Sequence, residues 1–100
     1  MKIRIPFNEW SKRRLMQVRK TATSRNKSYG EPGDFFEEVG NKYVLMMVKK
    51  LPLWFIADAL FASEGCESPD EFRNVWCEIH PRKGWDGKQE VFYHYFKRVS

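Results

Sequence analysis

A short segment near the amino terminus concentrates side chains that can do acid–base and nucleophilic chemistry. Residues 18 to 25 read VRKTATSR and bring a lysine, several hydroxyls and an arginine together. A hydroxyl is a poor nucleophile until a base takes its proton, and an amine serves as that base when burial or a neighbouring cation lowers its pKa. Solvated lysines and ordinary strand threonines have the same residue types, so both interpretations are open at this point.

A carboxylate is the second candidate for chemistry, and it comes from a helical pattern. After Pro52 the apolar residues repeat at the spacing of one helix face, which predicts a helix over residues 53–64 that stops at Gly65. The members of that face are Leu53, Ile56, Ala57, Leu60, Phe61 and Glu64. Glu64 is therefore either on the inward side of the predicted helix or a plain helix-terminal residue near solvent.

Three elements are predicted over residues 2–25, and the last of them holds most of the 18–25 segment. Residues 2–6 alternate polar and apolar side chains, which predicts a short strand ended by Pro6. Asn8 can cap a helix whose inward stripe holds Ser11, Leu15 and Val18. Residues 20–25, KTATSR, then read as a strand. In an ideal strand Lys20 and Thr23 lie on opposite faces, so they converge only if Lys20 precedes the strand or a bulge intervenes.

A hairpin is predicted in the middle of the chain. Residues 34–39, DFFEEV, and 42–50, KYVLMMVKK, both have strand character. Gly40 and Asn41 suit a two-residue turn between them.

The last part of the chain predicts a helix and an aromatic strand. Ser68 and Pro69 open a helix that ends before Pro81, Glu71 closes a capping box, and the stripe of Phe72, Val75, Trp76 and Ile79 is typical of core packing. Residues 89–99, QEVFYHYFKRV, form a strand buried on at least one side. The resulting order β, α, β, β, β, α, α, β predicts an α+β fold, a small mixed β-barrel with about three helices.

Composition and charge indicate one globular domain over residues 1–100. The sequence is 42% hydrophobic and 16% aromatic, and the longest apolar runs are too short for a membrane span. Since the start lacks a secretory signal, we expect a cytoplasmic location, and we also expect a monomer. The net charge of +5 is concentrated at the two ends of the chain, which is typical of a nucleic-acid binder or simply of a solvated surface. With Cys66, Cys77, His80 and His94 in no ligand spacing, we expect no metal, and no cofactor motif is present.

The segment around Lys20 resembles the signature of the ASCH domain family, a relative of the PUA RNA-binding fold. That signature has the form GxKxxExR, and Lys20 and Arg25 stand at its Lys and Arg positions. Thr23 replaces its Glu and Val18 its Gly. The replacement by Thr is similar to GRKTxTxR in the branch of ASCH enzymes that hydrolyse N4-acetylcytidine to cytidine. The resemblance extends over essentially the whole chain.

The resemblance implies a catalytic set of Lys20, Thr23 and Glu64. Lys20, beside Arg19 and Arg25, would take the proton of the Thr23 hydroxyl. Glu64 would protonate the leaving amino group and later activate water. The side chains expected to contact the nucleoside or RNA are Arg13, Arg19, Arg25, Lys27 and Tyr93.

Two other functions fit the same sequence. A non-catalytic RNA-binding module of the PUA-like type is favoured by the basic ends and by Trp10, Trp85 and Tyr29. An RNA-cleaving activity of the wider ASCH family is the third possibility. Fold kinship alone does not choose among the three.

Overall fold

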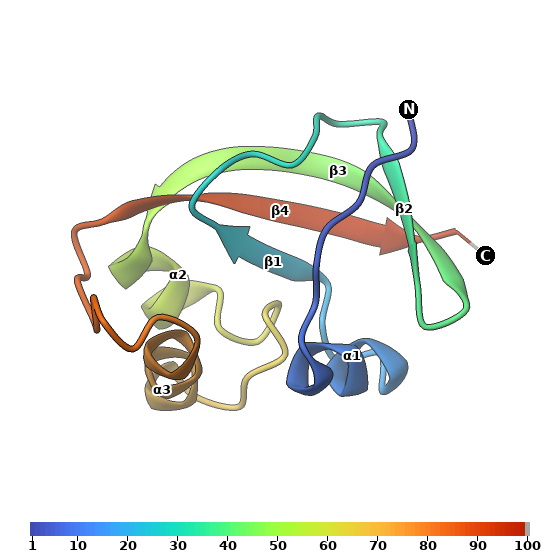
Figure 1. The fold of residues 1–100 in the computed structure, drawn as a ribbon. Helices are drawn as coiled ribbons and strands as arrows, with labels where there is room; N and C mark the ends of the chain where they lie inside the picture. The colour runs from blue at the N-terminus through green and yellow to red at the C-terminus, as the bar shows by residue number, and fades with distance from the viewer. Residues whose placement is uncertain (100) are drawn as a thin grey trace.

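A computed structural model describes residues 1–99 of the chain and shows a curled sheet with helices on one side (Figure 1). In chain order the elements are α1 (Glu9–Met16), β1 (Ala22–Arg25), β2 (Phe35–Glu38), β3 (Asn41–Pro52), α2 (Leu53–Ala59), α3 (Pro69–Ile79) and β4 (Glu90–Arg98). The strand order is β1-β4-β3-β2, and all three pairings are antiparallel. The predicted α+β class with three helices is confirmed, with the sheet curled into a half-barrel.

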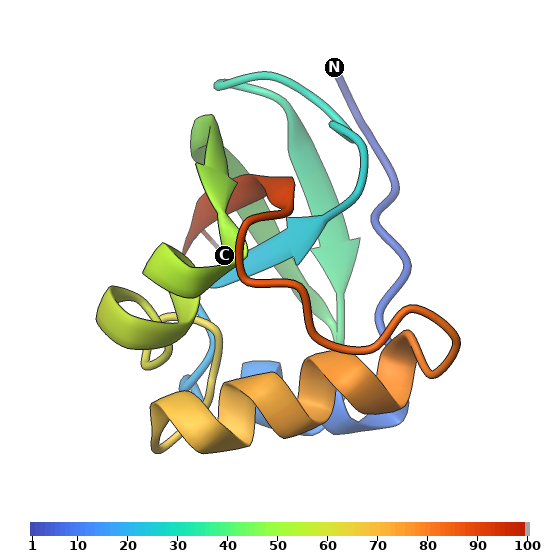
Figure 2. The ribbon, with the colours of Figure 1, turned by 90° about the vertical axis from the view of Figure 1, so that its left-hand side faces the viewer.

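The long strands β3 and β4 arch over the three helices, and the view in Figure 2 shows α3 passing beneath β1 with α1 behind it. One core cluster lies between this helical layer and the sheet and includes Ile56, Trp76 and Tyr93. A second cluster lies at the other end of the sheet and includes Leu15 and Phe96. Strand β1 is an edge strand, so one of its long sides is free to meet a loop or a ligand.

Helix α1 begins as its sequence predicts. The side chain of Asn8 accepts a hydrogen bond from the backbone N–H of Ser11 at 2.8 Å, and Ser11 and Leu15 are buried. The predicted stripe is wrong at Val18, which lies beyond the end of the helix and is 70% exposed. Helix α1 ends because Val18 adopts a left-handed backbone with φ of 58°.

The predicted strand at residues 2–6 is absent from the described fold. Lys2 forms one isolated parallel bridge with Phe35, and the rest of this segment is irregular. The alternating pattern is still explained by packing, because Ile5 is buried in the second core cluster. A single bridge is too little backbone pairing to make a strand.

The hairpin between β2 and β3 forms as predicted, but its turn lies one residue earlier. Glu38 pairs with Asn41, so the two turn residues are Val39 and Gly40 instead of Gly40 and Asn41. Both turn residues have positive φ, at 47° and 79°, as the tight turn of a twisted hairpin requires. The pairing of the strands, and not the preference of Asn41 for turns, fixes this register.

The predicted helix over residues 53–64 ends early, at Ala59. Glu64 consequently lies in the loop after α2 and is not on a helical stripe, although it is 4% exposed. Helix α3 begins at Pro69 with the hydroxyl of Ser68 accepting from the N–H of Glu71, as predicted. The carboxylate of Glu71 accepts from the N–H of Glu67 instead of closing the predicted capping box.

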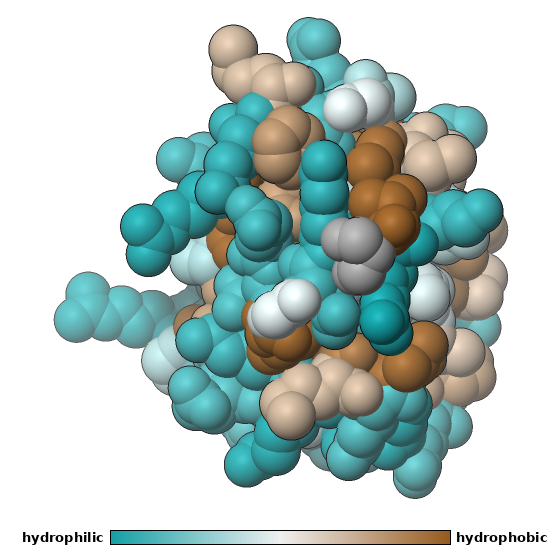
Figure 3. All heavy atoms as spheres, turned by 90° about the vertical axis from the view of Figure 1, so that its right-hand side faces the viewer, coloured by the Kyte–Doolittle hydropathy of each residue, from teal (hydrophilic) through white to brown (hydrophobic). Residues whose placement is uncertain are grey.

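The predicted aromatic strand is β4, and its alternating side chains pack in different core clusters. Val91 and Tyr93 pack in the first cluster, whereas Phe96 packs in the second. The molecular surface on the side of the C-terminus is mainly hydrophilic, with scattered hydrophobic residues (Figure 3). None of the helices within residues 1–99 has the length and apolar character needed to cross a membrane.

Candidate active site

A cavity of about 600 Å³ lies at the free edge of β1, against α1 and α3. Small-molecule sites are about 300 to 1,000 Å³, so the cavity has room for a nucleoside. Its polar side chains include Lys20, Thr23, Ser24, Arg25 and Glu64, and its apolar side chains include Trp10, Phe72, Val75, Trp76 and Ile79. We call this space the main cavity. The stripe of α3 that was predicted to be core thus also forms one wall of the main cavity.

The loop after α2 brings Glu64 to Lys20. The carbonyl oxygen of Ser63 accepts from the N–H groups of Thr21 and Ala22 at 2.7 and 2.9 Å, and Lys20 and Glu64 form an antiparallel bridge. Gly65 follows with φ of 92°, a conformation that favours glycine. Lys20 therefore precedes the strand, which is one of the two arrangements that allow its side chain to meet groups on the strand.

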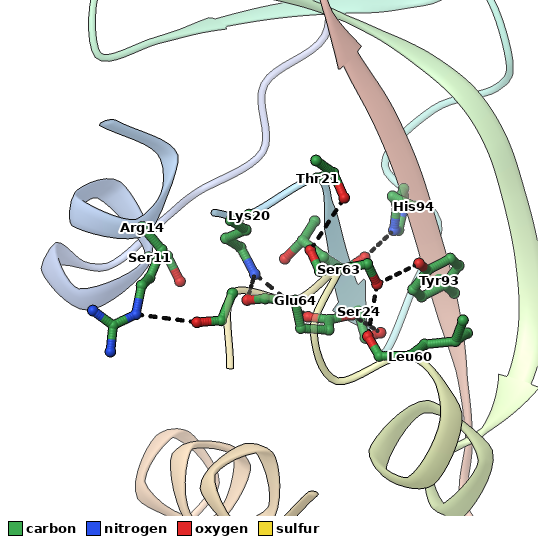
Figure 4. A network of polar contacts seen from close by, with 12 residues as sticks. Ser11, Arg14, Lys20, Thr21, Ser24, Leu60, Ser63, Glu64, Tyr93 and His94 are labelled. Carbon is green, nitrogen blue, oxygen red and sulfur yellow. Dashed lines mark hydrogen bonds and ion pairs between the residues drawn. The ribbon is translucent and has the colours of Figure 1, made fainter. Parts of the chain in front are cut away.

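Lys20 and Glu64 form a buried pair (Figure 4). The Nζ of Lys20 lies 3.4 Å from Oε1 of Glu64 and 3.1 Å from its carbonyl oxygen. The residues are 5% and 4% exposed. Burial lowers the pKa of Lys20 despite the opposing attraction of Glu64, and Arg25 lowers it further. A lysine with a lowered pKa can lose its proton and act as a base.

Ser24 is a site residue that the sequence analysis did not identify. Its hydroxyl donates to Oε2 of Glu64 at 2.7 Å, and Figure 4 shows Lys20, Ser24 and Glu64 directed toward one another. Strand alternation puts Ser24 on the face opposite Thr23. This alternation was visible in the sequence, but the position of Glu64 was not, so nothing marked Ser24 as functional.

Thr23 lies in the main cavity and is fully buried. Its Oγ1 accepts a hydrogen bond from Nη1 of Arg25. Within residues 1–99 the Thr23 hydroxyl makes no hydrogen bond to Lys20 or Glu64, so the structure brings Thr23 to the same cavity as the pair without direct contact. An oxygen that accepts from a guanidinium keeps its own proton available for transfer to a base.

Arg25 makes structural contacts within the wall of the main cavity. Besides Thr23, its guanidinium donates to the carbonyl oxygens of Ser24 at 3.0 Å and Pro6 at 2.7 Å, and it lies over the ring of Phe7. These contacts tie the N-terminal segment to β1 and orient Thr23. The expected direct contact of Arg25 with a nucleoside stays a prediction.

The other predicted binding residues are dispersed. Lys27 lines the main cavity, whereas Arg13 is exposed on α1 and does not line it. Arg19 is paired with Glu67 at 3.0 Å, also outside the cavity. Tyr93 pairs with Ser24 across the sheet but does not line the main cavity, and its hydroxyl is 2.6 Å from the hydroxyl of Ser63. Their roles in binding stay predictions, and of these four only Lys27 is at the main cavity.

His94 lies on β4 and connects β1 to the loop before β2 through hydrogen bonds. Its Nε2 accepts from the backbone N–H of Tyr29 at 3.1 Å, so the proton of the neutral ring is on Nδ1, which lies 3.2 Å from the carbonyl oxygen of Thr23. The ring is fully buried, and burial lowers the pKa of His94. His94 thus links Thr23 to the loop that carries Tyr29.

His80 is the C-cap of α3, directly before Pro81. It also lines the main cavity, with its ring stacked on Trp76 at 4.1 Å between centroids. Among the described residues no three His, Cys, Asp or Glu side chains are grouped as a metal ion would require.

Several solved structures share this fold. An ASCH domain from Lactobacillus crispatus JV V101 matches over 97% of this chain and 77% of its own, with a TM-score of 0.65 and 13% identity. The hypothetical protein PH0355 matches over 99% and 100%, with a TM-score of 0.70 and 16% identity. Protein EF3133 from Enterococcus faecalis V583, which carries the family designation DUF984, matches over 98% and 78%, with a TM-score of 0.63 and 18% identity.

These likenesses define the class of the fold, which is the one seen in the solved ASCH domain. No protein-family model matches the sequence, and neither does any curated protein. At identities of 13 to 18% the likeness extends to the fold alone, and function must be argued from the site.

Proposed function

We propose that this chain is an amidohydrolase that cleaves the N-acyl amide of nucleosides such as N4-acetylcytidine. One observation carries the proposal: a buried amine and carboxylate, Lys20 and Glu64, lie at the polar side of a cavity that also contains the hydroxyl of Thr23. The resemblance of the 18–25 segment to the N4-acetylcytidine branch supports the same three residues.

The walls of the main cavity suit a flat, weakly polar base. Trp10 comes from α1 and Trp76 and His80 from the α3 side, so aromatic surface faces the polar groups of β1. Aromatic side chains hold planar ligands by stacking and by burial of apolar area. The acyl group attached to such a base would then lie toward Lys20, Thr23 and Glu64.

In the proposed acylation step, Lys20 takes the proton from the Thr23 hydroxyl as its oxygen attacks the acyl carbon. The hydrogen bond from Arg25 to Oγ1 favours the developing alkoxide. Catalytic hydrogen bonds often form only once substrate is bound, so Lys20 needs to approach Thr23 in the complex. Lys20 passes this proton to the Glu64 carboxylate, Glu64 delivers it to the amino nitrogen, the carbon–nitrogen bond breaks, and the acyl group remains as an ester on Thr23.

In the proposed deacylation step, water hydrolyses the ester. The Glu64 carboxylate takes a proton from the water, whose oxygen attacks the ester carbon. The carbon–oxygen bond to Thr23 breaks, the proton on Glu64 returns through Lys20 to the Thr23 oxygen, and the carboxylic acid leaves. The same carboxylate thus serves as an acid in the first half of the reaction and as a base in the second.

The test is whether the purified chain releases cytidine from N4-acetylcytidine, with the product measured by chromatography. Thr23→Ala and Glu64→Gln should each lower kcat/KM by at least about a hundredfold. Thr21→Ala is the matched control, because Thr21 contacts only the carbonyl oxygen of Ser63 through its hydroxyl. No cytidine from the wild-type chain would overturn the proposal. Steeply salt-dependent RNA binding that survives Thr23→Ala would instead support a binding module.

A further inference from the structure

The Glu64 carboxylate is held at both of its oxygens by side chains from the two ends of one short segment. Lys20 contacts Oε1 and Ser24 contacts Oε2. We propose that Ser24 is a positioning residue that fixes the Glu64 carboxylate, so that Oε1 is the oxygen that exchanges protons. This inference rests on the proposed amidohydrolase function. The resemblance assigns no role to Ser24, since its position is a variable one in GRKTxTxR.

The two contacts differ in length. Ser24 Oγ lies 2.7 Å from Oε2, a short hydrogen bond to a charged acceptor, whereas Lys20 Nζ lies 3.4 Å from Oε1. Lys20 also donates to the main-chain carbonyl of Glu64 at 3.1 Å, which fixes the amine without the carboxylate. Oε2 is therefore the anchored oxygen, and Oε1 is held loosely enough to accept or donate a proton.

Loss of the Ser24 hydrogen bond would affect Glu64 strongly because both residues are buried. Ser24 is 5% exposed and Glu64 is 4% exposed, so a water molecule cannot easily take the place of the Ser24 hydroxyl as donor to Glu64. Without the Ser24 hydroxyl, the carboxylate would turn to share both oxygens with Lys20. A closer ion pair favours the ammonium form of Lys20 and so removes the base of the acylation step. Ser24 thereby prevents both carboxylate oxygens of Glu64 from pairing with Lys20.

A matched control is available on the same loop. The hydroxyl of Ser63 contacts the carbonyl oxygen of Leu60 and the hydroxyl of Tyr93, and not the carboxylate. Ser63→Ala therefore removes a hydroxyl from the 60–64 loop without removing a donor from Glu64. Ser24→Thr keeps a hydroxyl at position 24 and is the conservative variant.

The first experiment compares kinetics of the full chain over pH. Ser24→Ala should lower kcat about tenfold with KM within about twofold, and should move the rising limb of the pH–rate profile up by about one pH unit. Ser24→Thr should recover most of kcat, and Ser63→Ala should keep the wild-type profile. Ser24→Ala with unchanged kcat and profile would overturn the inference, and so would an equal shift in Ser63→Ala.

The second experiment separates this inference from the proposed function. The Lys20 side chain, labelled with ¹³C at Cε, is titrated by NMR in the wild type, Ser24→Ala and Ser63→Ala. The midpoint of Lys20 should rise by about one pH unit in Ser24→Ala and stay in place in Ser63→Ala, whether or not the chain hydrolyses any amide. If the Lys20 midpoint is the same in Ser24→Ala as in the wild type, the positioning role is refuted. If the midpoint shifts in Ser24→Ala but the wild-type chain releases no cytidine, only the hydrolase proposal is refuted.

Discussion

The Nζ of Lys20 lies 3.4 Å from Oε1 of Glu64, although 44 positions separate the two residues. A two-residue backbone bridge creates this contact by fixing the loop after α2 against the segment before β1. The pair is almost fully buried, so each charge depends on the other and on the few hydrogen bonds around it.

Removing one charge of this pair should strongly destabilise the fold. Lys20→Met leaves the Glu64 carboxylate buried beside an apolar chain, which costs about 3 to 5 kcal/mol. Lys20→Met combined with Glu64→Gln should recover part of that loss, because no bare charge remains. Urea unfolding measures both variants. The exposed pair of Arg73 and Asp58 is the control, and Arg73→Gln should cost less than about 1 kcal/mol.

Amide cleavage should increase with pH through the titration of Lys20. Burial lowers the pKa of Lys20 below its ordinary value of 10.5, and the base is active only after it loses its proton. The rate should rise with pH up to that lowered pKa and then level off. Lys20→Arg should abolish the rise, because a guanidinium stays protonated. A Lys20→Arg variant with the wild-type pH profile would show that another group titrates.

Stability should fall in mild acid because of His94. Burial lowers the pKa of His94 below 6.5, so between 6.5 and the lowered value the unfolded chain binds a proton that the folded chain does not. The free energy of unfolding is then highest above pH 6.5 and decreases as pH falls, by at most about 1.4 kcal/mol per pH unit. Urea unfolding from about pH 8 to 5 measures the slope. The slope should disappear in His94→Gln and persist in His80→Gln.

Glycine at position 18 should stabilise the chain. The N–H groups of Val18 and Arg19 bond to the carbonyl oxygens of Leu15 and Arg14, which is the Schellman arrangement that favours glycine at the left-handed position. Val18 is 70% exposed, so Val18→Gly loses little packing and should gain about 0.5 to 1 kcal/mol.

Val39→Gly is the comparison for that prediction. Val39 also has positive φ, but it packs against the second core cluster, so relief of backbone strain is offset by lost contacts. Thermal unfolding should show a higher Tm for Val18→Gly and a smaller gain, or a loss, for Val39→Gly. A lower Tm for Val18→Gly would mean that valine is not strained at position 18.

Local patterns were sufficient for much of the fold. Asn8 and Ser68 start their helices through bonds to the N–H groups three residues later, an interaction contained within one turn. The alternation in residues 22–25 and 90–98 likewise follows from strand geometry. Local patterns were insufficient where partners from elsewhere in the chain decide, as at the hairpin turn and at the early end of α2 after Ala59.

The sequence by itself determined which chemical groups are present and that Thr23 lies on a strand, but it placed Glu64 on a helix that ends at Ala59 and Lys20 inside a strand that begins at Ala22. The tertiary structure decided which hydroxyl meets the carboxylate, and it placed Ser24 there while Thr23 bonds to Arg25. The reason is that alternation assigns residues to the two faces of a strand, whereas the main cavity lies at the free edge of β1, where residues of both faces line it. The loop that supplies Glu64 reaches this edge through backbone pairing across more than 40 positions, and no local pattern encodes that distance.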